Sequence, residues 1–331
     1  MHPACPALRR TALARRAVSI LSILSLVSLA GMSPAARAGE VRVGVGVGGN
    51  LFSLRAINCN VGDHVIWVWN AGGHTCTSGD SSIGSGNGLW DSGFQSASLT
   101  NNTATFSWQA TGTGVFLYFC SPHAPPMAGR VIVAGSGIAV ADLRITEVQY
   151  NEAAGHDLIE VTNLGTVAGD LGRFRISIAN GVQVSLPPNT IPISPNGTVT
   201  IHTNETGTNT ATDVFLSALG ALPDAAGSVA LYVPNTRNTS LTDATQLADY
   251  VEWGAAGQPN EGTALTANVW TAGESAPVVA AGHSIEFCAG ASNPGTGRWF
   301  DNPAPNFNGL ADNCATPVRG TTWGRIKTLY R

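Results

Sequence analysis

The chain has 331 residues, with 17 Lys or Arg against 21 Asp or Glu, and its formal net charge at pH 7 is −4. This acidic balance, with a single lysine, excludes the basic surface on which nucleic-acid binding depends. No apolar run is long enough for a comfortable helical membrane span, so we expect no transmembrane segment in the mature chain.

The first 38 residues have the organisation of a secretory signal peptide. Four arginines within 9–16 precede an apolar stretch at 17–30, and Ala36-Arg37-Ala38 is a small-x-small cleavage site. Removing 1–38 takes away five basic and no acidic residues, which leaves 12 basic against 21 acidic, a charge of −9. We therefore expect an exported protein, periplasmic or extracellular.

The segment 39–134 is expected to form one all-β domain. Valines alternate with Arg and Gly from Val41 to Val47, as in a half-exposed edge strand. The run His64–Trp69 is apolar on both faces and predicts a buried central strand. The run Val115–Cys120 is an apolar, aromatic strand that ends on a thiol.

Four side chains in this segment have the chemistry of a metal site. Cys120, His123 and Met127 lie within eight residues after the apolar strand, and His74 follows the Gly72-Gly73 turn upstream. One thiolate, two imidazoles and a weak axial thioether are the ligand set of a blue-copper electron-transfer site. A single Cys-x-x-His or a Met near a His is common in protein cores, but four donors in this order favour copper.

The same segment resembles the plastocyanin/azurin-like cupredoxins. The resemblance rests on Val61-Gly62-Asp63, Gly72–Thr75, Trp90–Gly93, Tyr118–Cys120 and Met127–Val133. It implies a Greek-key sandwich that binds one copper ion, Cu(I) or Cu(II), through His74, Cys120, His123 and Met127. It also implies that a redox partner docks beside the exposed edge of His123, here against Ala124, Pro125 and Pro126. Only three residues, two of them prolines, separate His123 from Met127, so the loop should be stiff.

The cysteines suggest disulfides. If Cys5 leaves with the signal peptide and Cys120 binds copper, four remain, an even number in an exported chain. The simplest connectivity is Cys59 with Cys76 and Cys288 with Cys314; the alternative is buried free thiols.

After a linker at 135–140, the segment 141–316 predicts a second β-sandwich of the immunoglobulin type. Seven short strand-like runs alternate with turn signals, and 204–213 is rich in Thr and Asn, as an exposed loop would be. The segment resembles a lamin-tail domain in Ile145–Asn151, Asp157–Gly165, Asp249–Gly254 and Pro303–Asn308. That resemblance implies an interaction or scaffold module with a surface or matrix ligand. The strand-like runs are Leu143–Tyr150, Asp157–Thr162, Arg173–Ile178, Val182–Leu186, Val199–His202, Val229–Val233 and Tyr250–Trp253.

No catalytic constellation stands out. The carboxylates Glu147, Asp157, Glu160 and Asp249 could form a pair or a calcium site, but we expect strand glutamates to face solvent or cap turns. The chain has no His-x-His pair, as further copper centres of an oxidase or reductase would need. The tail 317–331, with helix-like spacing from Trp323 to Tyr330, is equally compatible with a docking turn and a frayed end.

The sequence thus predicts an exported, non-enzymatic electron carrier with a type 1 copper site and a lamin-tail-like interaction module. Two alternatives remain open. One is a copper-binding or buffering protein without electron shuttling. The other is a surface interaction protein in which copper is secondary.

Overall fold

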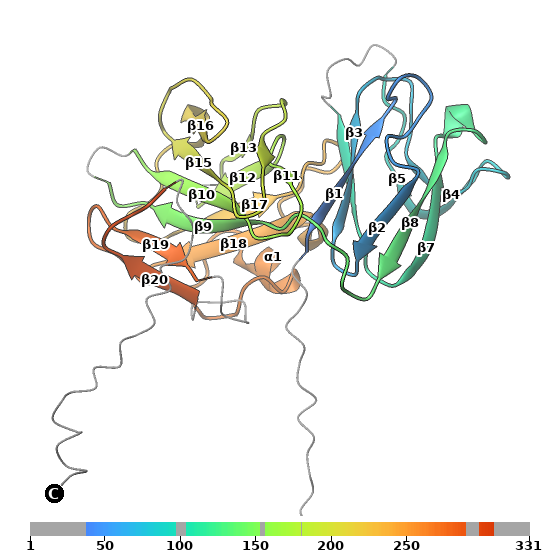
Figure 1. Cartoon of the computed structure of the whole chain (residues 1–331). Coiled ribbons are helices and arrows are strands. Elements are labelled where there is room, and N and C mark those ends of the chain that lie inside the picture. The colour runs from blue at the N-terminus through green and yellow to red at the C-terminus, as the bar shows by residue number, and fades with distance from the viewer. Residues whose placement is uncertain (1–37, 97–103, 153–155, 180, 289–297, 308–331) are drawn as a thin grey trace, which may run out of the picture. The chain divides into compact units, whose positions relative to one another are not determined.

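The computed structural model describes residues 38–96, 104–152, 156–179, 181–288 and 298–307 (Figure 1). All of these lie in one compact unit, Pro34–Arg331. The fold is all-β, as predicted; one short α-helix, α1, occupies Glu261–Thr266. Within the described ranges, no helix has the length and apolarity needed to cross a membrane. The expected signal peptide up to residue 37, Cys314 and the tail 317–331 lie outside the described residues.

The first sandwich is built from two sheets. One has the strand order β1-β3-β6 and the other the order β2-β8-β7-β4-β5. The pairs β1–β3 and β2–β8 are parallel, so the chain crosses between the sheets as in a Greek-key sandwich. The strands are β1 Glu40–Val45, β2 Ala56–Asn60, β3 His64–Trp69, β4 Thr77–Asp80, β5 Ser85–Asp91, β6 Thr105–Gln109, β7 Gly114–Phe119 and β8 Ala128–Ala134.

Strand β3 is buried along its whole length, as the sequence predicted, because each of its faces packs against a different core. Val65, Trp67 and Trp69 point into the core of the first sandwich. Trp67 is the centre of that core, with its ring centroid 5.6 Å from Trp90 and 5.4 Å from Tyr118. Ile66 and Val68, on the opposite face, belong to the core of the second sandwich.

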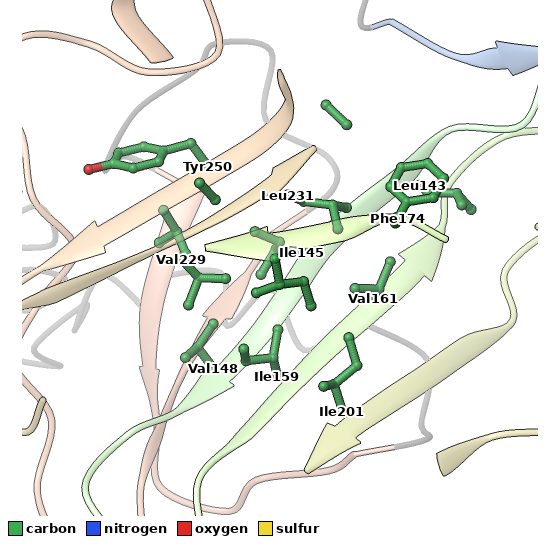
Figure 2. Close-up of a cluster of buried hydrophobic side chains, with 14 of the residues drawn as sticks. Leu143, Ile145, Val148, Ile159, Val161, Phe174, Ile201, Val229, Leu231 and Tyr250 are labelled. Carbon is green, nitrogen blue, oxygen red and sulfur yellow. The ribbon is translucent and has the colours of Figure 1, made fainter. Parts of the chain in front are cut away.

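The second sandwich packs a six-stranded sheet against a four-stranded one, with the orders β16-β15-β10-β9-β19-β20 and β13-β12-β17-β18. Figure 2 shows its core, in which Ile145, Ile159 and Ile201 of the larger sheet lie near Val229 and Leu231 of the smaller. A small sheet, β11 Gly169–Asp170 with β14 Pro192–Ile193, accompanies them. The main strands are β9 Leu143–Gln149, β10 Leu158–Asn163, β12 Arg175–Ile178, β13 Gln183–Ser185, β15 Thr198–Thr203, β16 Asp213–Leu216, β17 Gly227–Tyr232, β18 Leu247–Trp253, β19 Ser284–Phe287 and β20 Trp299–Asn302.

Each of the seven strand-like runs of this second segment overlaps a strand of the structure. The sequence did not predict β11, β14, β16, β19, β20 or helix α1. One expectation about side chains was wrong: Glu147 and Glu160 do not face solvent but are 2% and 1% exposed. Glu147 accepts hydrogen bonds from Ser284 and Asn302, which later strands bring beside it.

Hydrogen bonds join the two sandwiches directly. Arg42 Nη1 donates to Asp170 Oδ2 at 3.0 Å, and Ser107 Oγ donates to Gln246 Oε1 at 2.8 Å. The backbone N–H of Thr236 donates to the Thr105 carbonyl at 3.0 Å. Through these bonds and the contacts of Ile66 and Val68, the second sandwich covers the outer face of the β1-β3-β6 sheet.

The predicted Cys59–Cys76 disulfide is absent, and both residues are buried free thiols. The strand order explains why. Cys59 lies on β2 and Cys76 immediately before β4, and β8 and β7 run between these two strands. Three inter-strand steps amount to about 14 Å, whereas a disulfide needs Cα atoms within about 7 Å. The Cys288–Cys314 pair stays a prediction, since Cys314 lies outside the described residues.

Candidate metal centre

The loop after β7 places two of the predicted ligands on one short turn. Cys120 follows the last residue of β7, and its N–H donates to the Met127 carbonyl at 2.9 Å. The residues Ser121–His123 form a 3-10 turn, η1, in which the His123 N–H donates to the Cys120 carbonyl at 3.0 Å. The Met127 N–H donates in turn to the His123 carbonyl at 3.1 Å. Backbone hydrogen bonds therefore hold this loop closed around the predicted ligands.

His74 arrives from the other side, on the loop between β3 and β4. Its carbonyl accepts hydrogen bonds from Trp69 Nε1 at 3.2 Å and from the Gln95 N–H at 3.1 Å. Trp69 is fully buried at the end of β3, and His74 is 4% exposed. The central strand thus anchors this histidine through the indole of its last residue.

Three donor atoms converge. The Nδ1 atoms of His74 and His123 lie 3.2 Å apart, and Cys120 Sγ lies 3.6 Å from the first and 3.3 Å from the second. These three residues are the group among the described residues whose donor atoms cluster closely enough to hold a metal ion. Met127, 1% exposed, belongs to the same core cluster as Cys120.

The spacing of the donors fits a metal ion. A circle through three atoms separated by 3.2, 3.3 and 3.6 Å has a radius of about 2 Å, the usual length of a bond from a metal to an imidazole nitrogen. The donors are one sulfur and two nitrogens in a nearly equilateral triangle, the trigonal set typical of copper in electron-transfer proteins. The triangle therefore requires no rearrangement of the backbone to receive copper.

Burial sets the protonation of the donors. Burial raises the pKa of the Cys120 thiol, while the backbone N–H of Thr75, 3.4 Å from Sγ, opposes that rise by stabilising the thiolate. Burial and the neighbouring His123 lower the pKa of His74, which keeps its imidazole neutral and able to bind a metal. A metal that binds here displaces the thiol proton.

A hydroxyl network behind the donors, not anticipated from the sequence, fixes both ligand loops. Thr75 Oγ1 accepts a hydrogen bond from the Ser121 N–H at 2.8 Å and another from Thr77 Oγ1 at 3.1 Å. Asp91 Oδ1 lies 3.1 Å from the same Thr77 hydroxyl. The network links the His74 loop to the Cys120 loop, as partners behind metal ligands commonly do.

Gly46 is a second residue that the sequence analysis missed. It lies beside His74 with φ +76°, and a Cβ built there would be 2.8 Å from Cδ2 and 2.9 Å from Nε2 of that ring. Glycine is thus required both for the left-handed backbone and for the space that the imidazole occupies. The alternating-valine pattern of 41–47 gave no sign of this contact.

The surface around the donors is apolar. His123 is half-buried, and Pro125 and Pro126 on the same loop are exposed; the Ala124–Pro125 peptide is cis. On the loops that adjoin His74, Val47 is 38% exposed and Phe94 60% exposed. The predicted docking edge is therefore part of a wider apolar rim.

Three other histidines lie away from this centre. His64 is on β3, and its Nε2 is 2.8 Å from the Thr245 carbonyl in the second sandwich. His202 lies between Glu205 and Asp213, at 3.2 and 3.1 Å. His283 pairs with Asp301 at 2.8 Å. These histidines have hydrogen-bonding partners of their own, as expected for residues outside the metal site.

Comparison with known proteins finds a family match for part of the chain. The family described as copper binding proteins, plastocyanin/azurin family, matches residues 39–134. Among solved structures, plastocyanin from Dryopteris crassirhizoma is 22% identical over 28% of this chain and 100% of its own, with a TM-score of 0.23. A purple cupredoxin from Nitrosopumilus maritimus is 23% identical over 28% and 99%, with a TM-score of 0.23. Pseudoazurin from Hyphomicrobium denitrificans is 20% identical over 29% and 76%, with a TM-score of 0.23. No curated protein matches the chain.

The family match and the donor triangle agree on one part of the molecule. Residues 39–134 form a copper-binding domain of the plastocyanin/azurin type, and copper is the cofactor that its Cys and His donors take.

Proposed function

We propose that this protein is an electron carrier that uses one copper ion held by His74, Cys120 and His123, with Met127 as a weak axial ligand. The observation that carries the proposal is the triangle of donor atoms with sides of 3.2, 3.3 and 3.6 Å. Bound copper would supply the one-electron exchange between Cu(II) and Cu(I). No catalytic turnover by the chain itself is part of this function.

The residues of the site favour fast electron exchange because they hold the donors in place. The loop bonds of Cys120 and Met127, the indole of Trp69 and the hydroxyl of Thr75 restrain the donors from four directions. A trigonal set with a weak axial ligand suits both oxidation states, so little reorganisation accompanies the gain or loss of an electron. A copper buffer would need no such geometry.

We further propose that a redox protein docks on the apolar rim around His123. Ala124, Pro125 and Pro126 form one side of this rim, and Val47 and Phe94 stand on the loops beside His74. His123 is the more accessible of the two histidines, and electrons would pass through its ring. An apolar rim makes encounter depend on contact more than on charge, so the rate should respond weakly to salt.

A redox titration of the copper-loaded protein tests this function. We expect one electron per protein, taken up and released reversibly, in the wild type and in Cys59→Ala. Cys59 is a matched control because it is also a buried free thiol of the same sandwich, and it lies outside the donor triangle. Cys120→Ser should lose the reversible couple. A wild type that binds copper tightly without cycling would support copper buffering instead.

For the rest of the chain we propose the organisation expected from the sequence. Segment 1–38 directs export and is removed, 135–140 links the domains, 141–316 is a lamin-tail-like module, and 317–331 is a tail. The two packed sheets between Leu143 and Asn302 support a sandwich with an interaction role. Exported material should begin at Gly39 by mass, and its binding to cell-surface material should be the same in Cys120→Ser. Loss of that binding with the copper ligand would argue against a separate interaction module.

A further inference from the structure

A cavity of about 380 Å³ lies where strand β6 of the copper domain meets the second sandwich. Its size falls at the lower end of the range for small-molecule sites. Thr105 contributes from β6, and the remaining walls come from the second sandwich, among them Arg173, Arg175, Leu186 and Leu216. The cavity has no part in the copper site, and no part of the proposed electron transfer uses it.

The cavity holds a concentration of positive charge without an acidic wall. Arg173 and Arg175 both line it, at 8% and 3% exposure, and none of the lining residues is Asp or Glu. Among the described residues, no carboxylate lies within the 4.0 Å of an ion pair to Arg175. The lack of such a partner at Arg175 is unusual in a chain with an acidic excess, because buried charges are normally paired.

Neutral groups hold Arg175 in position. Its Nε and Nη2 each donate to the Val233 carbonyl at 3.3 Å, and its guanidinium lies 5.3 Å from the Tyr232 ring centroid. With the Gln183 amide turned to its hydrogen-bonding orientation, the amide oxygen accepts from Nη1 at 3.2 Å. Burial lowers the pKa of Arg175 to about 10, and the charges of Tyr232 and Asp243 offset only part of that effect. The Arg175 side chain is thus held in position, and it has no direct ion pair among the described residues.

A second observation points to a ligand in the same cavity. Thr105 is 1% exposed, and its Oγ1 is a buried polar atom without a hydrogen-bond partner. Both backbone groups of Thr105 are used, since its N–H donates to Thr236 Oγ1 and its carbonyl accepts from the Thr236 N–H. Buried hydroxyls almost always have a partner, so an unpaired one on the wall of a cavity indicates a position for a hydrogen-bonding guest.

We infer that this cavity binds a small organic acid, with its carboxylate between Arg173, Arg175 and the Thr105 hydroxyl. Guanidinium groups bind carboxylates through charge-assisted hydrogen bonds, and the hydroxyl adds a neutral donor. The apolar wall made by Leu186, Pro187 and Leu216 suits the hydrocarbon part of such an acid better than a fully hydrated phosphate or sulfate. Because Thr105 belongs to the copper domain, the ligand contacts both sandwiches.

Benzoate and its neutral amide, benzamide, are a matched pair of probes for the intact mature protein. We expect benzoate to bind in calorimetry and to raise the unfolding temperature with increasing concentration, and benzamide to do neither. Phosphate should bind more weakly than benzoate. The copper chromophore should not change, which separates this test from that of the proposed electron transfer.

Thr105→Val is the decisive variant because it removes the unpaired hydroxyl and keeps the shape of the side chain. It should weaken benzoate binding about tenfold, the loss typical of a buried hydrogen bond to a charged group, without lowering the stability of the ligand-free protein. Arg173→Gln should weaken binding further, and Thr113→Val, at an exposed position of the copper domain, should have no effect. Absent benzoate binding at millimolar concentration, equal binding of benzamide or phosphate, or unchanged binding by Thr105→Val would overturn the inference.

Discussion

Replacing Gly46 by alanine separates the cost of an unusual backbone from the cost of crowding the metal site. Gly46 has φ +76° and Gly48 has φ +63°, so alanine at either position adopts a left-handed conformation that costs about 1–2 kcal/mol. A Cβ at Gly48 meets no atom within 4 Å, whereas one at Gly46 lies 2.8 Å from Cδ2 of His74. Gly48→Ala is therefore the matched control for Gly46→Ala.

The difference between the two variants should appear in copper binding. His74 is 4% exposed, so its ring can yield to the new methyl group only by leaving its preferred rotamer. That change costs about 0.5–1.5 kcal/mol, and Gly46→Ala should therefore bind copper up to about tenfold more weakly than Gly48→Ala. Competition titration against a copper chelator measures the affinities, and urea unfolding of the metal-free proteins should show similar stability losses. Equal copper affinities in the two variants would refute the role assigned to Gly46.

Three further predictions follow from the rim, the strand β3 and the contact between the sandwiches. Ala124→Glu should slow electron exchange with a partner about tenfold, while Ala139→Glu, at an exposed position outside the Cys120–Met127 loop, should not. Equal rates in the two variants would mean that the partner docks elsewhere. Burial lowers the pKa of His64 from 6.5 to about 4, so its contribution to stability is complete above pH 6.5 and is lost as pH falls toward 4. That loss amounts to about 3 kcal/mol in urea unfolding, and a His64→Gln variant with an unchanged pH profile would contradict it. Ile66→Ala should lower the stability of both sandwiches together by about 2–5 kcal/mol in a single calorimetric transition, and two separate transitions would show that they unfold independently.

Local patterns were sufficient to predict part of the strands, β3 and β7 among them, and to point to the loop that carries Cys120 and His123. The apolar run His64–Trp69 forms the buried strand β3, and the aromatic run before Cys120 forms β7, which is buried at its end. Both could be predicted because the period and composition of a run determine which residues can form a sheet core. In the loop Cys120–Met127, backbone hydrogen bonds between near neighbours hold the predicted ligands in place. The order of residues in the sequence is therefore enough to suggest that they lie close together. His74 lies only five residues after the end of the run His64–Trp69, so the turn at Gly72-Gly73 that carries it could also be predicted.

The errors concern contacts that depend on strand order. Cys59 and Cys76 are 17 positions apart, yet two strands that come much later in the chain run between theirs. Glu147 and Glu160 alternate with apolar residues as exposed positions do, but both are buried. Later segments cover Glu147, and Asn306, for example, donates its N–H to it. The need for glycine at position 46 likewise comes from the His74 ring, 28 positions later in the chain. A short-range pattern carries no information about such neighbours.

The visible absorption spectrum of the Cu(II)-loaded mature protein tests the central claim most directly. A thiolate bonded to Cu(II) within the His74, Cys120 and His123 triangle should give an intense charge-transfer band in the visible range. The band should persist in Cys59→Ala and disappear in Cys120→Ser. A colourless wild type with stoichiometric copper, or a band that survives in Cys120→Ser, would contradict the account.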